Sequence, residues 1–273
     1  MAIREKFGRL VLLEQGEPGP LGLECRAARL GPTGLDRLVT VTRFGPGVSS
    51  SVEATRRLMD EARLAARTPS PGLVRVLGIG RVEQSFYVST ELVEGRSLAA
   101  IFERCRGEAF PFAADHALMI ASRAAVALEP LHARKGDAGE ALAHGLVAPS
   151  RLVVAYDGEV KVKGLGLWPS LRGTGLLPPE ERLYLAPEQA AGEVGDPRSA
   201  VYALGLVPLA ALTGQPQDGA DPVSRLAGAQ VTSTTGERGP LPEPLANLLR
   251  RALEPDPSRR LAVAAALRKA IDP

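Results

Sequence analysis

The segment HGLVAPSRLVVAYDGEVKVKGLGLW, residues 144–168, decides the fold of the second half of the chain. Two aliphatic runs flank Asp157-Gly158, the dipeptide that best fits the tight turn of a β-hairpin. We therefore predict two antiparallel strands joined here, and we interpret Asp157 and Glu159 as turn residues rather than catalytic carboxylates. Apart from these and the leading His144, the segment contains no His, Asp, Glu or Cys, the side chains that most often act as metal ligands or general acids and bases.

The first third of the chain is typical of a small antiparallel sheet interrupted by one helix. Apolar runs at 9–14, 23–30 and 37–44 are separated by Gly and Pro clusters, and similar runs follow at 73–82 and 85–93. Between them, residues 51–67 have apolar positions at helical spacing. These positions are Val52, Ala54, Leu58, Ala62, Leu64 and Ala65.

The rest of the chain is predicted to be mainly helical. The most apolar helical segments cover 115–134 and 199–214. Because strands come first and helices later, the fold class is α+β with two lobes.

Composition limits the classes of function. The chain has 273 residues, 45% of them hydrophobic, which suits one large domain or two tightly joined lobes. The net charge of +2 gives no global field that favours nucleic acid or a membrane surface. Cys25 and Cys105 are too few to form a disulfide framework, so we expect reduced thiols and a cytoplasmic protein. The sequence shows no signal peptide and no transmembrane run.

Six segments resemble, in order, the landmarks of a bacterial Hanks-type serine/threonine protein kinase. They are LVTVTRF, MDEARLAAR, YVSTELVEGRSL, HGLVAPSRLVV, GLG and YLAPEQ, and DPSRRL follows near the end. The resemblance implies a two-lobed kinase-like fold over a single domain, residues 1–273, with an N-lobe at about 1–93 and a C-lobe at about 94–273. It also implies an ion pair between Glu188 of the Ala-Pro-Glu motif and Arg260.

The same alignment places unsuitable residues at the catalytic positions. Thr42 stands where kinases carry the phosphate-binding Lys, and the adjacent Arg43 points to the opposite strand face. Glu61, the usual partner of that Lys, is expected to be a solvated or re-paired surface charge. Leu146 replaces the catalytic base and Ala148 the catalytic-loop Lys.

Both metal-ligand positions are also changed. Arg151 replaces the metal-binding Asn, and Gly164 replaces the metal-binding Asp, so the resemblance leaves no oxygen ligands for a hard cation. The glycines of GEPGPLG, residues 16–22, are spaced one residue wider than in a phosphate-binding loop, and its prolines lack N–H donors, which indicates a turn. We therefore predict no catalytic residues, no metal site and no cofactor.

The positions that are kept suit packing. His144, Leu165 and Ala65 fall where the family stacks a spine of side chains, and His144 is expected to be packed and hydrogen-bonded. Ala200 replaces the Asp that braces the catalytic loop from a long buried helix. The resemblance with an emptied active centre implies a pseudokinase, a binding module that scaffolds or allosterically regulates a signalling partner.

Two alternatives remain. A nucleotide-binding switch without phosphotransfer would hold adenine at Thr90, Glu91 and Val93, and an enzyme with rearranged phosphoryl or nucleotidyl transfer would need carboxylate-held metal.

The expected partner is a protein. An active kinase is favoured because kinase-like lobes commonly pair through the helix that corresponds to residues 52–67. Dimerisation is compatible with this expectation, and neither nucleic acid nor membrane is expected. The candidate docking surfaces are helix 52–67 with Arg56 and Arg57, and the segment around Trp168. In that segment Leu171, Leu176 and Leu177 form either an exposed apolar patch or part of the core.

Overall fold

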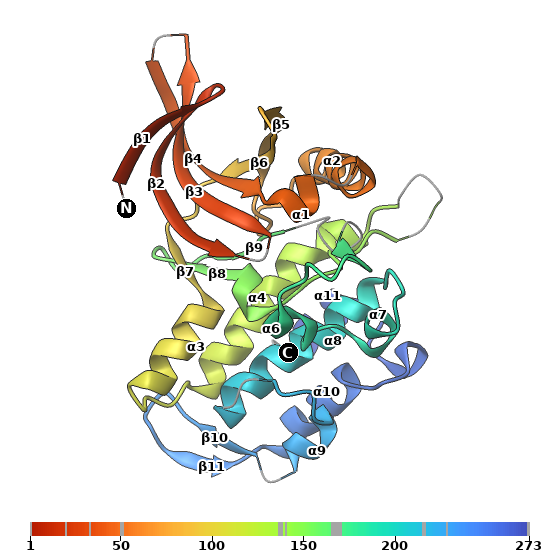
Figure 1. The fold of residues 1–273 in the computed structure, drawn as a ribbon. Coiled ribbons are helices and arrows are strands. Elements are labelled where there is room, and N and C mark those ends of the chain that lie inside the picture. The colour runs from red at the N-terminus through yellow and green to blue at the C-terminus, as the bar shows by residue number, and fades with distance from the viewer. Residues whose placement is uncertain are drawn as a thin grey trace. The chain divides into compact units, whose positions relative to one another are not determined.

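The structure is a computed structural model that describes residues 2–19, 21–32, 34–49, 52–135, 139, 141–164, 171–214, 217–227 and 229–271. It divides into two compact units. Unit 1 comprises Met1–Pro69, Val74–Glu94 and Leu165–Pro178, and unit 2 comprises Ser70–Leu73, Gly95–Gly164 and Pro179–Pro273. Strands dominate the first unit and helices the second, so the predicted α+β class is confirmed (Figure 1).

Unit 1 is built on a six-stranded antiparallel sheet in the order β1-β2-β3-β4-β6-β5. The strands are β1 Ala2–Phe7, β2 Leu10–Gly19, β3 Gly22–Gly31, β4 Gly34–Phe44, β5 Val76–Val82 and β6 Ser85–Glu91. All the predicted strands are present, and β1 is an addition that the sequence pattern did not indicate. Alternation along β4 places Val39 and Val41 in a core cluster with Leu12 and Cys25, because successive side chains point to opposite faces.

The glycine-rich segment 16–22 is mostly strand rather than turn. Its first four residues complete β2, and β3 begins at Gly22. Gly19 pairs with Gly22, so the predicted turn is present but takes up only the part of the segment between these two glycines. Gly22 has φ +133°, and a Cβ there would lie 2.0 Å from the Arg43 carbonyl oxygen. This glycine is therefore required for the close approach of β3 to the end of β4.

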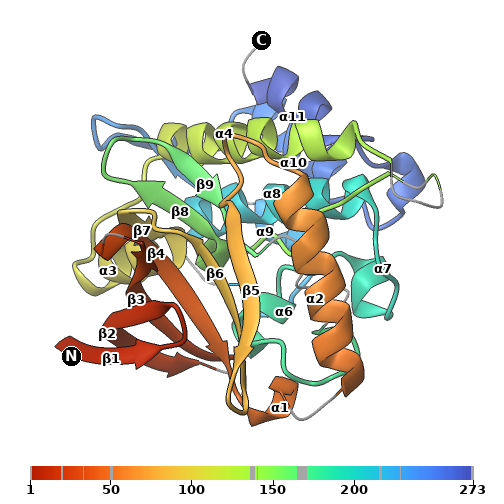
Figure 2. The ribbon, with the colours of Figure 1, turned by 90° about the horizontal axis from the view of Figure 1, so that it is seen from above.

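Helix α2, Val52–Arg67, follows the short helix α1, Pro46–Ser49, and packs beside β5 (Figure 2). Ala54, Leu58, Ala62 and Ala65 form its buried face, as the helical spacing predicted. Two residues assigned to that face were wrong. Val52 is 85% exposed and Leu64 is 37% exposed, because they lie to either side of the narrow apolar stripe.

Unit 2 is mainly helical. Its helices are α3 Leu98–Gly107, α4 Ala114–His132, α6 Pro179–Arg182, α7 Pro187–Ala190, α8 Pro197–Thr213, α9 Pro222–Leu226, α10 Glu243–Ala252 and α11 Ala264–Ile271, with 3-10 turns η1 Pro149–Arg151 and η2 Pro257–Arg259. α8 is buried along almost its whole length and packs against α4, α10 and α11. A Cβ on its Gly205 would lie 3.0 Å from the Ala252 Cβ, so this glycine lets α8 and α10 approach closely.

Two small sheets complete unit 2. One contains β7 Gly95–Ser97, β8 Leu152–Ala155 and β9 Val160–Val162, and the other contains β10 Gln230–Thr232 and β11 Arg238–Pro240. The hairpin predicted at Asp157-Gly158 joins β8 to β9. Gly158 has φ +90°, and Asp157 Oδ1 accepts a hydrogen bond from the Glu159 N–H at 3.0 Å. These residues are therefore turn residues, as predicted.

Among the helices of the described residues, none is both long and apolar enough to cross a membrane.

Candidate functional site

The segment that resembles the catalytic loop lies inside the core of unit 2. His144, Leu146 and Ala148 are all buried, with at most 1% of their surface exposed. The Leu146 N–H lies 3.4 Å from Nδ1 of His144 and donates to it, so His144 is packed and hydrogen-bonded. Burial, with the Arg151 charge as the second cause, lowers the pKa of His144 from its ordinary value of 6.5 to about 3. This imidazole is therefore neutral at physiological pH.

Gln189 of α7 fixes the backbone of the same segment. Its Nε2 donates to the Gly145 carbonyl at 2.6 Å, and its Oε1 accepts from the Ala186 N–H at 3.2 Å. Ala200, at the position of the usual bracing Asp, is buried in α8 and offers no polar group. Gln189 is thus a support that sequence analysis missed, although it follows directly after the Ala-Pro-Glu motif.

Arg151 is held by a buried carboxylate. Its Nη2 donates to Glu181 Oε2 at 3.0 Å, and its Nε lies 2.9 Å from Oε1. The Ser150 hydroxyl also donates to this carboxylate. Only 11% of the Arg151 side chain and 4% of the Glu181 side chain are exposed. Sequence analysis identified Arg151 but not Glu181, which lies 30 residues further along the chain.

Gly164 is the last described residue before 171. It has φ +90°, a conformation that side chains with a Cβ rarely adopt. The remaining Leu165 and Gly166 of this motif, and Trp168, lie outside the described residues. The predicted roles of Leu165 in packing and of Trp168 in docking are therefore untested.

The expected ion pair between Glu188 and Arg260 is present. The two side chains meet through two parallel contacts, Nη1 to Oε1 at 2.9 Å and Nη2 to Oε2 at 3.1 Å. Arg260 also donates to the carbonyls of Glu254, Arg198 and Pro255. Burial would raise the pKa of Glu188, but hydrogen bonds from Arg260 and Ser199 outweigh it, and the pKa is lowered. This pair joins α7 to the loop before α11.

In unit 1, Thr42 lies in β4 between Glu24 of β3 and Val88 of β6. Its neighbour Arg43 is directed to β1, where the guanidinium carbon lies 4.6 Å from the centre of the Phe7 ring and Nη1 lies 3.6 Å from Glu5 Oε1. As strand alternation predicted, Arg43 does not take over the position of the missing Lys.

Glu61 agrees with expectation only in part. It is half-buried on α2, and among the described residues no ion pair is formed by its carboxylate. Burial is the main cause of a raised pKa, and the neighbouring Asp60 charge adds to it. The carboxylate is thus partly solvated, as expected, but packing of α2 shields it more than a fully exposed surface charge.

Residues of α2, the end of α1 and strands β5 and β6 line a cavity of about 260 Å³, and Arg56 is one of them. Val52, Met59 and Phe86 supply apolar lining. Arg57 pairs with Glu53 on the same helix, whereas Arg56 is exposed and has no such pair within the described part of the chain. Arg56 is therefore the stronger of the two predicted docking residues.

The second predicted docking surface is largely part of the core. Leu171 and Leu177 are buried, and Leu176 lies against Gly47, where an added Cβ would be 3.1 Å from the leucine Cδ2. An exposed apolar patch at these leucines was thus a wrong interpretation, because they are taken up by packing.

Comparison with protein families matches residues 46–270 to the protein kinase domain. The chain belongs to the protein kinase family. As a kinase domain, it is 26% identical over 98% of its length to the tyrosine-protein kinase MasK of Myxococcus xanthus, and 28% identical over 84% of its length to the serine/threonine-protein kinase PrkC of Bacillus subtilis. The matches cover 43% and 35% of those two proteins, so the kinase domain spans less than half of the length of these relatives.

The fold agrees with solved kinase structures. The crystal structure of the Mycobacterium tuberculosis PknI kinase domain matches with a TM-score of 0.74 at 20% identity, covering 100% of this chain and 98% of that one. At this identity the match concerns the fold, and it agrees with the six-stranded sheet and the helical unit described above.

The two residues predicted to stand at the family's metal-ligand positions do not fit magnesium. Arg151 presents a guanidinium, which is committed to Glu181, and Gly164 has no side chain. Magnesium requires oxygen ligands. In the described ranges, no group of three His, Cys, Asp or Glu side chains gathers as a metal site.

Proposed function

We propose that this kinase domain is a pseudokinase, which acts by binding a protein partner and does not transfer phosphate. The observation that carries the proposal is the ion pair between Arg151 and Glu181. A guanidinium at the second metal-ligand position both repels a divalent cation and is held in place by a buried carboxylate. The Arg151 guanidinium is therefore buried in the folded unit and is not an exposed surface charge.

The other replaced positions support the same function. Leu146 lies in the core, where it cannot accept a proton from a substrate hydroxyl. The positive φ of Gly164 disfavours any residue that has a Cβ, so a carboxylate could not return there without strain. Phosphoryl transfer depends on positioned metal ions and charged groups, and these groups act as a unit.

A phosphotransfer assay tests the catalytic part. We expect no transfer of radiolabelled phosphate from magnesium-ATP to the chain itself or to a generic basic protein, with an active kinase domain as the positive control. Leu146→Asp alone should also be inactive, because one restored group does not rebuild the metal site. Transfer above that of a heat-inactivated sample would contradict the proposal and would support an enzyme with rearranged chemistry.

The proposed binding role uses α2. Its cavity combines exposed Val52, apolar Met59 and Phe86 with the unpaired charge of Arg56, so a partner could contribute an apolar side chain beside an acidic group. The favoured partner is an active kinase in the reducing cytoplasm. A docked lobe that binds one conformation of the partner kinase more tightly would increase the population of that conformation.

Arg56→Glu tests this role in a pull-down with a purified kinase that co-isolates with the parent chain. We expect the variant to lose the kinase, whereas Arg259→Glu, a charge reversal on unit 2, should retain it. Trp168→Ala should be measured in parallel for the second surface. Equal recovery by every folded variant would show that neither surface is the docking site.

Nucleotide binding without transfer is the alternative that a thermal-shift assay separates. The Glu91 N–H donates to the Arg75 carbonyl at 2.9 Å, so this N–H is not available to adenine. A ligand at a hundred times its dissociation constant adds about 2.7 kcal/mol of stability. We expect no shift with millimolar ATP. A magnesium-dependent shift would favour the switch.

A further inference from the structure

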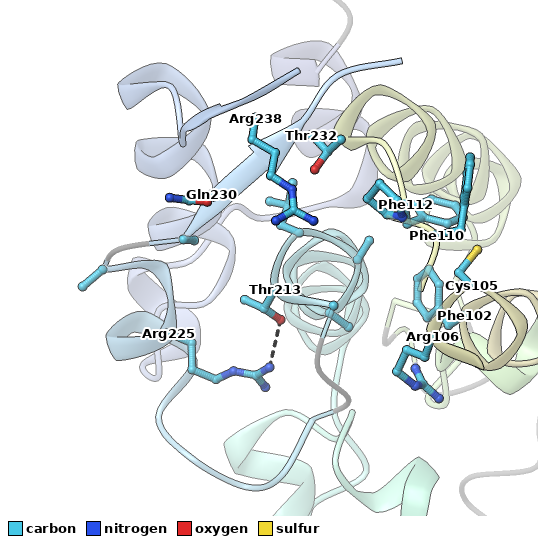
Figure 3. A pocket seen from close by; sticks show the side chains of 17 residues that line it. Phe102, Cys105, Arg106, Phe110, Phe112, Thr213, Arg225, Gln230, Thr232 and Arg238 are labelled. Carbon is cyan, nitrogen blue, oxygen red and sulfur yellow. Dashed lines mark hydrogen bonds between the residues drawn. The ribbon is translucent and has the colours of Figure 1, made fainter. Parts of the chain in front are cut away.

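A second hollow lies within unit 2, and none of the predicted site or docking residues lines it. It has a volume of about 460 Å³ and is bounded by the end of α3, the loop after it, the end of α8 and the segment from α9 to β10 and β11 (Figure 3). A hollow of this volume can accommodate a large side chain of a partner or a small-molecule ligand. None of the assigned or proposed roles of the chain uses this hollow.

One wall of the hollow is aromatic. Phe102 and Phe112 meet edge to face with ring centres 5.1 Å apart, and Phe110 beside them is 67% exposed. An aromatic ring left so open in a folded domain is a common feature of binding surfaces, where such rings contribute much of the affinity.

The remaining rim is cationic. Arg106, Arg225 and Arg238 line the hollow, and none of the 17 described residues that form it is acidic. Figure 3 shows Arg238 reaching from the hairpin toward the end of α8, with Arg225 to one side and the phenylalanines to the other.

The three arginines differ in the contacts that their guanidinium groups make within the protein. Arg225 is held by Gln217 and Thr213 at 2.8 and 3.0 Å, and Asp218 lies 3.8 Å from it. Arg106 and Arg238 are exposed and form no ion pair with any described residue. Two guanidinium groups are therefore available to an anion beside an apolar wall.

The shape favours an extended segment over a small molecule. Small-molecule sites usually bury most of their ligand, whereas the exposed Phe110 shows that this hollow stays open to solvent. A neighbouring hollow of about 530 Å³ continues past the hairpin, because Thr232 and Arg238 line both. Its lining combines the apolar Leu118, Leu245 and Leu248 with the acidic Asp115 and Glu237, so the cationic character belongs to the first hollow.

We propose that the first hollow binds an acidic peptide segment of a partner protein, with an aromatic or large aliphatic side chain against the phenylalanines and flanking anionic groups on Arg106 and Arg238. Carboxylates and phosphate share the chemistry that two arginines recognise. The inference does not depend on the absence of phosphotransfer or on docking through α2, so its failure would leave the proposed function standing.

Selection from a phage-displayed library of random dodecapeptides tests this site on the full chain. We expect the recovered peptides to combine Asp or Glu with an aromatic or large aliphatic residue. The affinity of a synthetic recovered peptide should fall about tenfold in Arg106→Gln and again in Arg238→Gln, the size of one charge-assisted hydrogen bond each. Arg104→Gln is the matched control, because Arg104 lies on the same helix, pairs with Glu108 and does not line the hollow.

Phe110→Ala tests the aromatic wall, and its exposed position means that the fold should be retained. Cys105 lines the hollow while Cys25 is buried, so the bound peptide should slow alkylation of Cys105 alone. Replacing the acidic residues by phosphoserine shows which anion binds better. The proposal is overturned if no peptide is enriched, if the enriched peptides are not acidic, or if they bind the double arginine variant as well as the parent.

Discussion

The guanidinium of Arg151 and the carboxylate of Glu181 form a buried ion pair, with Nη2 and Oε2 3.0 Å apart. Arg151 precedes β8 and Glu181 lies in α6, so the pair ties the segment after residue 178 to the hairpin sheet of unit 2. Such a pair makes Arg151, which stands at a predicted metal-ligand position, part of the stability of the fold. Removing the Arg151 side chain should therefore lower the free energy of unfolding.

Arg151→Ala should lower the free energy of unfolding by about 3 to 5 kcal/mol, because it leaves Glu181 buried and unpaired. The double variant Arg151→Met with Glu181→Leu should recover most of this loss, since neither charge remains. Urea unfolding measures both. The exposed pair Arg57 and Glu53 is the control, and Arg57→Ala should cost less than about 1 kcal/mol. Equal effects of the two alanine variants would show that the buried pair is not structural.

Arg260→Ala should be similarly destabilising, by about 3 to 5 kcal/mol, because the Glu188 charge loses its partner inside the unit. The adjacent Arg259 is a matched control, since 71% of its side chain is exposed and it lies 3.8 Å from Glu254. Arg259→Ala should melt within a degree or so of the parent. If Arg260→Ala also melts like the parent, the pair does not fix α7 to the end of the chain.

Acid should destabilise unit 2 through its buried histidines. Burial lowers the pKa of His144 to about 3 and that of His132 to about 4. Between these values and 6.5, the unfolded chain binds protons that the folded chain excludes. Stability should therefore fall as the pH drops through this window, by up to about 1.4 kcal/mol per pH unit for each histidine.

Urea unfolding at a series of pH values measures this slope. His144→Gln should make the slope shallower, whatever it does to stability at neutral pH. His116→Gln, at the exposed third histidine, should leave the slope unchanged. An unchanged slope in His144→Gln would show that this residue does not take up a proton on unfolding.

Glu61→Gln should stabilise unit 1 at neutral pH. Burial raises the pKa of Glu61, so its charged form is disfavoured in the folded state, and the stability gained from the protonated form is lost as the pH rises through the folded-state pKa. The gain should stay below about 1 kcal/mol because Glu61 is only half-buried. It should vanish under acidic conditions, where both states are protonated.

A thermal melt at neutral and at acidic pH measures the effect of Glu61→Gln. Glu53→Gln on the same helix is the control, and it should give no gain because Glu53 is exposed and paired with Arg57. A loss of stability in Glu61→Gln at neutral pH would mean that the carboxylate has a favourable partner.

Local patterns were enough to predict the α+β class with two lobes and, apart from β1, the strands of the first sheet. Alternation gave the strands of the first sheet, and helical spacing gave α2, because both depend only on neighbours along the chain. The Asp157-Gly158 turn was predictable for the same reason. Spacing could not decide the edges of the buried face, so Val52 and Leu64 were misassigned, and the backbone at Gly22 depends on how closely β3 approaches β4.

Motif order along the sequence was by itself enough to single out Leu146, Arg151 and Gly164 as the residues predicted to replace catalytic groups. Only the tertiary structure decided what these residues contact. Glu181 reaches Arg151 across 30 residues, and Gln189 reaches Gly145 across 44. The hollow between Arg106 and Arg238 likewise joins two distant segments. No local pattern encodes such contacts, because they exist only when folding brings separate elements of unit 2 together.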